Sequence, residues 1–108
     1  VRNSIFKNNK IGAAIKDNSI GLFNDNKFLN NDIQIASYAK NWRYGSGGNV
    51  KIQNSIIESK ENKFVTTMDP EDFKKKKDKN LNQNSKINVL NSKIIGKKII
   101  IGKNFFLK

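Results

Sequence analysis

A sequence pattern that occurs four times limits the folds open to this chain more than any other feature. In each copy an apolar residue is followed two positions later by Asn or Asp, and three positions after that by a second apolar residue. The copies begin at Val1, Phe23, Ile52 and Val89. A repeat of this kind indicates a stack of similar units, because one short unit cannot bury its own apolar side chains.

The first copy also indicates the secondary structure of each unit. We expect short strands over 1–6, 11–15 and 20–23, the first of them with one buried face. Asn8-Asn9 and Asp17-Asn18-Ser19 separate these segments, and such residues favour turns. Three strands and three turns in 22 residues predict one coil of a right-handed parallel β-helix. An antiparallel sandwich of short strands is the alternative that the Asn-rich turns also fit, but the common register of the four copies favours the β-helix.

Stacking the four copies predicts columns of inward-facing side chains on strands about 4.8 Å apart. The first column contains Val1, Phe23, Ile52 and Val89. The second contains Phe6, Phe28, Ile57 and Ile94, and the third contains Ala13, Ile35, Phe64 and Ile101. A further column, at the turns, contains Asn3, Asp25, Asn54 and Asn91. Their stacked side chains can hydrogen-bond along the axis of the stack. In three copies a serine follows this turn residue, at Ser4, Ser55 and Ser92.

The copies differ in length because of two insertions. Successive copies start 22, 29 and 37 residues apart, which places insertions of about 7 and 15 residues near 36–49 and 66–86, on turns of the stack. The second insertion contains Asp69-Pro70-Glu71-Asp72, a helix-start sequence that predicts a short α-helix near residues 70–78. We therefore expect one all-β domain over residues 1–108: a right-handed parallel β-helix of about four coils with two turn insertions, one containing a short α-helix.

Composition excludes several classes of chemistry. The absence of Cys removes disulfides and thiolate metal sites, and the absence of His removes a Ser-His-Asp triad. We expect no metal, no cofactor and no transmembrane segment, since no apolar run approaches the roughly 20 residues that span a bilayer. The net charge of +12 suits nucleic acid or an anionic surface, but only two of the 21 basic residues are Arg, and Lys, Asn and Ile make up about half the chain. Nucleic-acid binding through the basic face is therefore the less favoured hypothesis.

The insertion near 36–49 contains the candidate binding residues. It holds the sequence Lys-Asn-Trp-Arg-Tyr-Gly-Ser-Gly-Gly, with the only Trp and both Tyr of the chain nearby. Aromatic rings beside a cation can stack on sugars and bond carboxylates, whereas a purely structural role would fold the rings over the side of the stack. The polar cluster Lys16-Asp17-Asn18-Ser19 belongs to the preceding coil and lies beneath this insertion in the stacked arrangement. There it can share the binding surface or form an ion pair with Arg43. The candidate ligand-binding residues are Lys16, Asp17, Lys40, Trp42, Arg43 and Tyr44.

An enzymatic function is the alternative to a binding function. Polysaccharide lyases and epimerases on β-helices use a basic residue to remove the proton beside a uronate carboxylate, and Lys16, Lys40 or Arg43 could take that role. No acidic cluster lies near these residues in the sequence, and Asp17 and Asp25 do not form the carboxylate pair of an inverting hydrolase. We therefore assign no catalytic residue and expect the segment to be non-catalytic.

Two motifs, Ile11-Gly-Ala-Ala-Ile-Lys-Asp-Asn-Ser19 and Asn41-Trp-Arg-Tyr-Gly-Ser-Gly-Gly48, carry a family resemblance. The chain resembles right-handed parallel β-helix repeat proteins of the pectate-lyase-like superfamily. It is most similar to the β-helix tail of bacterial proteins with a CotH kinase-like domain. The resemblance implies an accessory module of a larger exported or cell-surface bacterial protein, with a glycan, a partner protein and an upstream domain of the same chain as expected partners. The long second insertion departs from the short turns usual in such repeats. The start at Val1, inside a repeat, also suggests a piece of a longer protein.

Overall fold

The computed structural model of the chain describes residues 1–40, 47–59, 65–66, 85–96, 100–101 and 104–108. Within these residues the chain forms twelve β-strands and no helix. The short α-helix predicted near 70–78 lies outside the described residues. No helix in this described part is long and apolar enough to cross a membrane.

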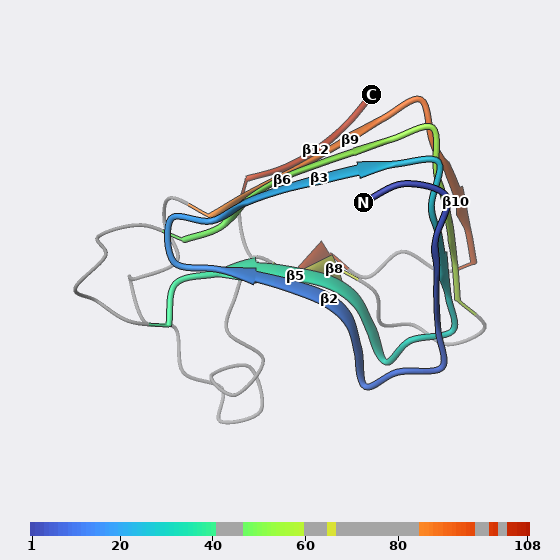
Figure 1. Cartoon of the computed structure of the whole chain (residues 1–108), viewed down its shortest axis with the longest axis horizontal. Coiled ribbons are helices and arrows are strands. Elements are labelled where there is room, and N and C mark those ends of the chain that lie inside the picture. Colours follow the sequence, from blue (N-terminus) through green and yellow to red (C-terminus); the bar gives the residue numbers. More distant parts are fainter. Residues whose placement is uncertain (41–46, 60–64, 67–84, 97–99, 102–103) are drawn as a thin grey trace.

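The strands form three parallel sheets of four strands each, which we name after their first strands (Figure 1). The β1 sheet contains β1 (Ile5–Lys7), β4 (Lys27–Leu29), β7 (Ile56–Glu58) and β10 (Lys93–Ile95). The β2 sheet contains β2 (Ile11–Lys16), β5 (Ile33–Tyr38), β8 (Val65–Thr66) and β11 (Ile100–Ile101). The β3 sheet contains β3 (Ile20–Asn24), β6 (Asn49–Gln53), β9 (Lys86–Leu90) and β12 (Phe105–Leu107).

Each strand pairs with the strand three places later in the chain, so that the chain visits the three sheets in turn. We call each run of three consecutive strands a layer, from layer 1 (β1 to β3) to layer 4 (β10 to β12). All the strand pairs formed by the described residues are parallel, which excludes the antiparallel sandwich for this part of the chain. The arrangement is compatible with a parallel β-helix.

The register confirms two of the predicted columns along most of their length. Phe23 pairs with Ile52 and Ile52 with Val89 in the β3 sheet, whereas Val1, the first predicted member of this column, is 59% exposed. The full second column, from Phe6 to Ile94, is in register in the β1 sheet. Both columns alternate with outward positions, as strands with one buried face require.

The third column is confirmed only in its first pair. Ala13 pairs with Ile35, but Ile35 pairs with Val65 rather than Phe64, and Ile100 rather than Ile101 pairs with Val65. The last two predicted members are therefore wrong by one residue. Since side chains alternate along a strand, a shift of one residue exchanges its two faces.

The predicted strand at 1–6 is also wrong, because the backbone turns within it. Asn3 has a φ of 52°, so the strand β1 starts only at Ile5, and Arg2 forms an isolated bridge to Asn24. Asp25, Asn54 and Asn91 have φ values of 58°, 54° and 48° at the equivalent positions. Asn and Asp tolerate this left-handed conformation better than other residues with a side chain, which confirms the predicted column of turns.

The apolar core of the described part lies between the three sheets. Its buried side chains are Ile15, Phe23, Phe28, Ile35, Val50, Ile52, Ile57, Ile87 and Val89. Phe28 is 0% exposed and stacks on Phe6 with ring centroids 4.9 Å apart, while Phe23 meets both rings edge-on. The partly buried residues packed against this core belong to layer 1 or layer 4: Phe6, Ala13, Ile94 and Phe105. The core is therefore most fully enclosed in the two middle layers.

A hydrogen-bonded column connects all four layers at the turn before the β1 sheet. The Ser4 amide donates to Asn26 Oδ1 at 2.9 Å, the Asn26 amide to Ser55 Oγ at 3.1 Å, and the Ser55 amide to Ser92 Oγ at 3.0 Å. Asn26 is 1% exposed and supplies in layer 2 the oxygen that serine supplies in layers 3 and 4. The column gives each of these backbone N–H groups a partner, which buried polar groups require.

A second column of amide side chains runs along the exposed side of the same turn. Asn91 Nδ2 donates to Asn54 Oδ1 at 2.6 Å, and Asn54 Nδ2 donates to Asn24 Oδ1 at 3.0 Å. The predicted bonding of stacked amides along the stack is confirmed between Asn54 and Asn91. The acceptor for Asn54 is Asn24, the last residue of β3, rather than its neighbour Asp25.

The turn before the β2 sheet encloses a buried polar cluster around Gln34, which is 0% exposed. Gln34 Nε2 donates to the Glu58 carbonyl at 2.7 Å and to Ser59 Oγ at 2.8 Å. Gln34 Oε1 accepts from Asn31 Nδ2 at 2.5 Å, and the same Nδ2 donates to the Phe6 carbonyl at 2.9 Å. The cluster therefore links layers 1, 2 and 3 through side-chain hydrogen bonds.

Candidate functional site

The candidate site lies where the chain passes from β5 to β6. Strand β5 continues to Tyr38, and β6 begins at Asn49, so 36–38 belong to the β2 sheet and the connection itself spans 39–48. The structure describes its two ends, 39–40 and 47–48. Every residue of β5 after Ile33 is buried, so this strand is covered on both of its faces.

The first end of the connection is held by a candidate residue of layer 1. The Lys40 amide donates to Asp17 Oδ1 at 2.7 Å, and the Asp17 amide donates to the Tyr38 carbonyl at 3.1 Å. Asp17 adopts a left-handed turn with a φ of 46°, which turns the chain directly after Lys16 at the end of β2. The structure thus brings together Lys16, Asp17 and Lys40, as stacking of the first two copies predicts.

The second end is held by layers on both sides. The Asn18 amide donates to the Gly47 carbonyl at 3.3 Å in layer 1, and the Lys86 amide donates to the Gly48 carbonyl at 2.9 Å in layer 3. The Asn49 amide donates to the Ser19 carbonyl at 2.9 Å. Backbone bonds to both neighbouring layers fix where the chain re-enters the β3 sheet.

Glycine is required at Gly48 by its close approach to the β2 sheet. A Cβ there would overlap the Ile15 carbonyl oxygen and lie 2.7 Å from Ser37 Oγ. At Gly47 a Cβ would overlap Ser85 Oγ. The hydroxyls of Ser37 and Ser85 are buried and have no hydrogen-bond partner among the described residues. A small, tightly packed junction therefore supports this end of the connection.

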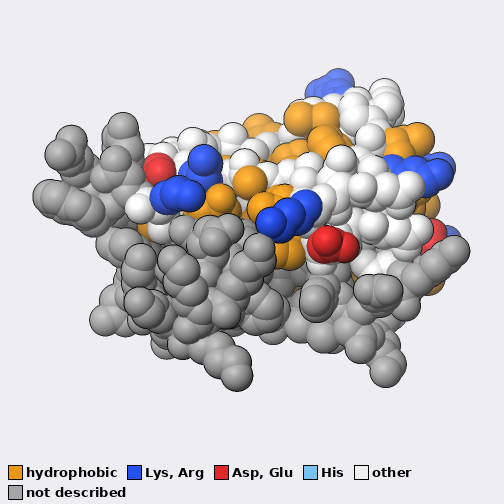
Figure 2. Space-filling view, turned by 90° about the horizontal axis from the view of Figure 1, so that it is seen from below, with side chains coloured by type: hydrophobic (Ala, Val, Ile, Leu, Met, Phe, Trp, Pro, Cys, Tyr) orange, Lys and Arg blue, Asp and Glu red, His pale blue; other side chains and the backbone are white. Residues whose placement is uncertain are grey.

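The aromatic part of the predicted site, Trp42, Arg43 and Tyr44, lies outside the described residues. Sugar stacking by the rings and pairing of Asp17 with Arg43 therefore stay predictions. The side chains of Lys16 and Lys40 are exposed beside Asp17. Figure 2, seen from the side on which the β2 sheet lies in Figure 1, shows Lys and Arg side chains next to hydrophobic ones at the border of the undescribed residues.

Acidic side chains do not gather anywhere in the described part of the chain. No group of three Asp or Glu side chains that could hold a metal ion occurs there. The described ends of the connection therefore offer cations, one carboxylate and backbone groups. This combination can bind hydroxyl and carboxylate groups by hydrogen bonding and charge.

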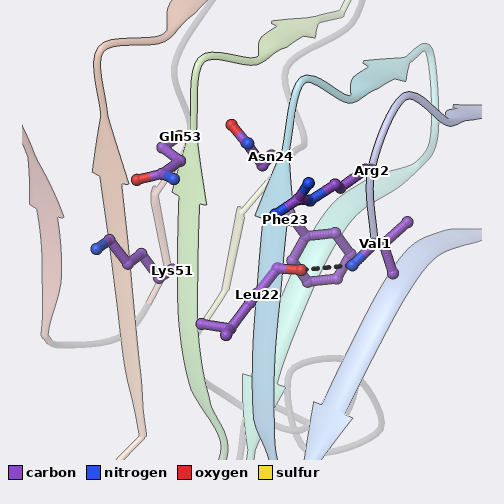
Figure 3. A pocket seen from close by; sticks show the side chains of 7 residues that line it. All are labelled: Val1, Arg2, Leu22, Phe23, Asn24, Lys51 and Gln53. Atoms are coloured by element: carbon purple, nitrogen blue, oxygen red, sulfur yellow. Dashed lines mark hydrogen bonds between the residues drawn. The ribbon is translucent and has the colours of Figure 1, made fainter.

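The structure also contains a feature that the sequence analysis missed, a hollow of about 350 Å³ along strand β3 (Figure 3). Its lining residues are Val1, Arg2, Leu22, Phe23, Asn24, Lys51 and Gln53. The repeat contained the information needed to find it: if Phe23 and Ile52 point inward, the residues next to them point outward and lie side by side. The strand columns predicted from the repeat contain only inward positions.

Comparison of the chain with protein-family models, with curated proteins and with solved structures finds no match. The resemblance to β-helix repeat proteins therefore depends on the sequence motifs and on compatibility with the parallel strand order.

Proposed function

We propose that this chain is a non-catalytic scaffold and binding module, built as a right-handed parallel β-helix of about four coils and part of a larger bacterial protein. The pairing of every strand with the third strand after it supports the β-helix. In Figure 1 the chain runs clockwise through the three sheets while later layers lie farther from the viewer, which supports the right hand. The sequence resemblance to the β-helix tails of proteins with a CotH kinase-like domain supports the accessory role.

The observation that carries the binding function is the attachment of both ends of the 39–48 connection to the stack. The first end bonds to Asp17, and the second bonds to layers 1 and 3 through the carbonyls of Gly47 and Gly48. A connection held at both ends loses less conformational entropy on binding than a free one, which raises affinity. The structure of the ends thus supports a rigid base for a ligand-binding segment.

We infer that the ligand is a glycan or a partner protein. Trp42 and Tyr44 supply rings that can stack on a sugar face, and Lys16, Lys40 and Arg43 supply cations for carboxylates. Acidic polysaccharides combine both features. They are therefore the first ligands to test.

The test uses Trp42, the only Trp of the chain. Polygalacturonate and neutral dextran are titrated into the protein at low and at moderate salt while Trp fluorescence is followed. We expect a saturable change with polygalacturonate that persists at moderate salt, because stacking is not screened by ions. No change with either polysaccharide at either salt concentration would overturn the proposal for glycans.

Two variants test whether the ligand binds at the 39–48 connection rather than elsewhere on the surface. By calorimetry, Trp42→Ala is expected to weaken polygalacturonate binding about tenfold or more, which corresponds to at least about 1.4 kcal/mol. Phe106→Ala is the matched control, since Phe106 is an aromatic residue that is 44% exposed on β12. Equal losses in both variants would contradict a site on the connection. Release of unsaturated products that disappears in Lys16→Ala would instead favour a polysaccharide lyase.

A further inference from the structure

The outer side of the β3 sheet has the character of a surface that meets an anionic lipid bilayer. We propose that it binds a membrane containing negatively charged lipids, with the strands lying in the plane of the bilayer. In Figure 1 it is the upper side of the stack, and no described segment covers it. None of its residues belongs to the 39–48 connection, so the proposal does not depend on the function proposed above.

The strand register determines which residues form this surface. In β3, β6 and β9 the inward core residues alternate with outward ones, and the outward residues of neighbouring strands lie side by side about 4.8 Å apart. The outer β3 face consists of every second residue of these strands, beginning with Ile20, Asn49 and Lys86. Because these residues point away from the axis of the stack, a further layer at either end would lie beside them and not over them.

The charge of the outer β3 face is entirely positive. It carries Lys51 on β6 and Lys86 on β9, both exposed, and no strand of the sheet contains Asp or Glu. Three amide side chains of β6 and β9 add N–H donors for phosphate oxygens. The outer side of the β1 sheet differs, because it carries the carboxylate of Glu58 among its lysines. Anionic headgroups therefore attract the outer β3 face without repulsion from a carboxylate on that face.

Large apolar side chains on the same face favour a bilayer over a soluble polyanion. Ile20 is 72% exposed and Leu22 is 61% exposed, and they are neighbours on the outward side of β3. Leu22 pairs with Lys51, and only Asn49 separates Ile20 from Lys86 across the sheet. A soluble polyanion would neutralise the lysines but leave Ile20 and Leu22 in water, whereas the boundary between headgroups and acyl chains would cover them. Lysine stems can lie along such apolar surface and hold their ammonium groups at the level of the phosphates.

The test measures binding of the full chain to lipid vesicles by sedimentation at low salt. One set of vesicles contains equal parts of phosphatidylglycerol and phosphatidylcholine, and the other contains phosphatidylcholine alone. We expect saturable binding to the anionic vesicles, at least about tenfold tighter than to the neutral ones, because each lysine near an anionic surface contributes about fivefold. No binding to the anionic vesicles, or equal binding to both sets, would overturn the proposal.

A matched pair of isoleucine variants tests which face meets the bilayer. Ile20→Asn is expected to weaken binding to anionic vesicles about tenfold, since it removes a large apolar side chain from contact with lipid. Ile5→Asn is the control, because Ile5 is 62% exposed on the outer side of the β1 sheet, and its affinity is expected to change less than about twofold. Equal losses in both variants would overturn the proposal. Unchanged binding of Ile20→Asn would identify the face as a site for a soluble polyanion and would also overturn it.

Two double lysine variants separate the charge of the face from the charge of the whole chain. Lys51→Ala combined with Lys86→Ala removes both cations of the face and is expected to weaken binding more than about tenfold. Lys27→Ala combined with Lys93→Ala removes the same charge from exposed positions of the β1 sheet, and is expected to weaken binding less than about threefold. Equal losses would show attraction to the net charge of the chain and would overturn the proposal. Unchanged far-UV circular dichroism of each variant excludes unfolding as the cause.

Discussion

Replacement of Phe28 by Ala tests the stacked core most sharply. The Phe28 side chain is 0% exposed, stacks on Phe6 at 4.9 Å and meets Phe23 edge-on at 5.6 Å. Truncation of a buried Phe to Ala costs about 3–5 kcal/mol, and each lost aromatic pair adds to the effect, so we expect about 4 kcal/mol for Phe28→Ala. Phe6 occupies the same column in layer 1 and is only partly buried, so Phe6→Ala is expected to cost about half as much.

The assay is urea unfolding followed by far-UV circular dichroism. With a slope of about 2 kcal/mol per molar urea, Phe28→Ala should lower the midpoint by about 2 M and Phe6→Ala by about 1 M. Phe106→Ala, at an exposed position of β12, is the control and should cost less than about 0.5 kcal/mol. If Phe6→Ala destabilised the protein as much as Phe28→Ala, the reasoning that layer 1 is less enclosed than layer 2 would be refuted.

Three further predictions concern turns and buried polar groups, and urea midpoints measure all of them. Gln34→Ala should cost about 2–3 kcal/mol because it leaves several buried groups without partners; a loss below 1 kcal/mol would count against the cluster. Gly48→Ala should cost about 1–3 kcal/mol, since its Cβ overlaps the Ile15 carbonyl; unchanged stability would mean that the junction relaxes freely. Asn26→Ala should cost about 2 kcal/mol, because the Asn26 side chain is 1% exposed and bonds the Ser4 amide and the Val1 carbonyl; an unchanged midpoint would contradict the described turn.

The repeat predicted the fold well where its positions are restricted to one kind of residue. Inward positions such as those of Phe28 and Ile57 must be apolar, and left-handed turn positions favour Asn or Asp, so both kinds of column could be identified from sequence. Asn26 shows the limit of this approach. It takes the place of a serine because its side-chain oxygen accepts the same bond, and a search for serine alone passes over it.

The errors have equally definite physical causes. Three apolar residues in a row at 99–101 fit several registers, so the pattern alone could not choose between Ile100 and Ile101. The strand predicted over 1–6 includes Asn3, yet this single left-handed residue delays the start of the strand to Ile5. Both errors arise because apolar periodicity defines neither the register of a wholly apolar run nor the backbone conformation of a single residue.

The candidate site could be predicted only in part. Stacking of consecutive copies indicated that Asp17 lies beneath the start of the connection, and the bond to the Lys40 amide agrees with this. The hollow along β3 was missed because only inward positions were predicted, although the same register places outward residues such as Leu22 and Lys51 side by side. The fold places Leu22 and Lys51 side by side, which gives the hollow both an apolar and a cationic lining.

The central claim, that each strand stacks on the strand three places earlier, can be tested most directly with pairs of spin labels. The outward residues Ile5, Lys27, Ile56 and Lys93 lie in register across the β1 sheet. The chain contains no Cys, so two can be introduced and labelled at will. Backbone separations from Ile5 should be about 5, 10 and 14 Å to the second, third and fourth positions.

We therefore predict that dipolar broadening in the EPR spectrum decreases from Ile5–Lys27 to Ile5–Ile56 and again to Ile5–Lys93. Singly labelled proteins provide the unbroadened reference for each pair. An equal broadening in all three pairs, or a stronger one for Ile5–Lys93 than for Ile5–Lys27, would contradict the stacked order of the strands.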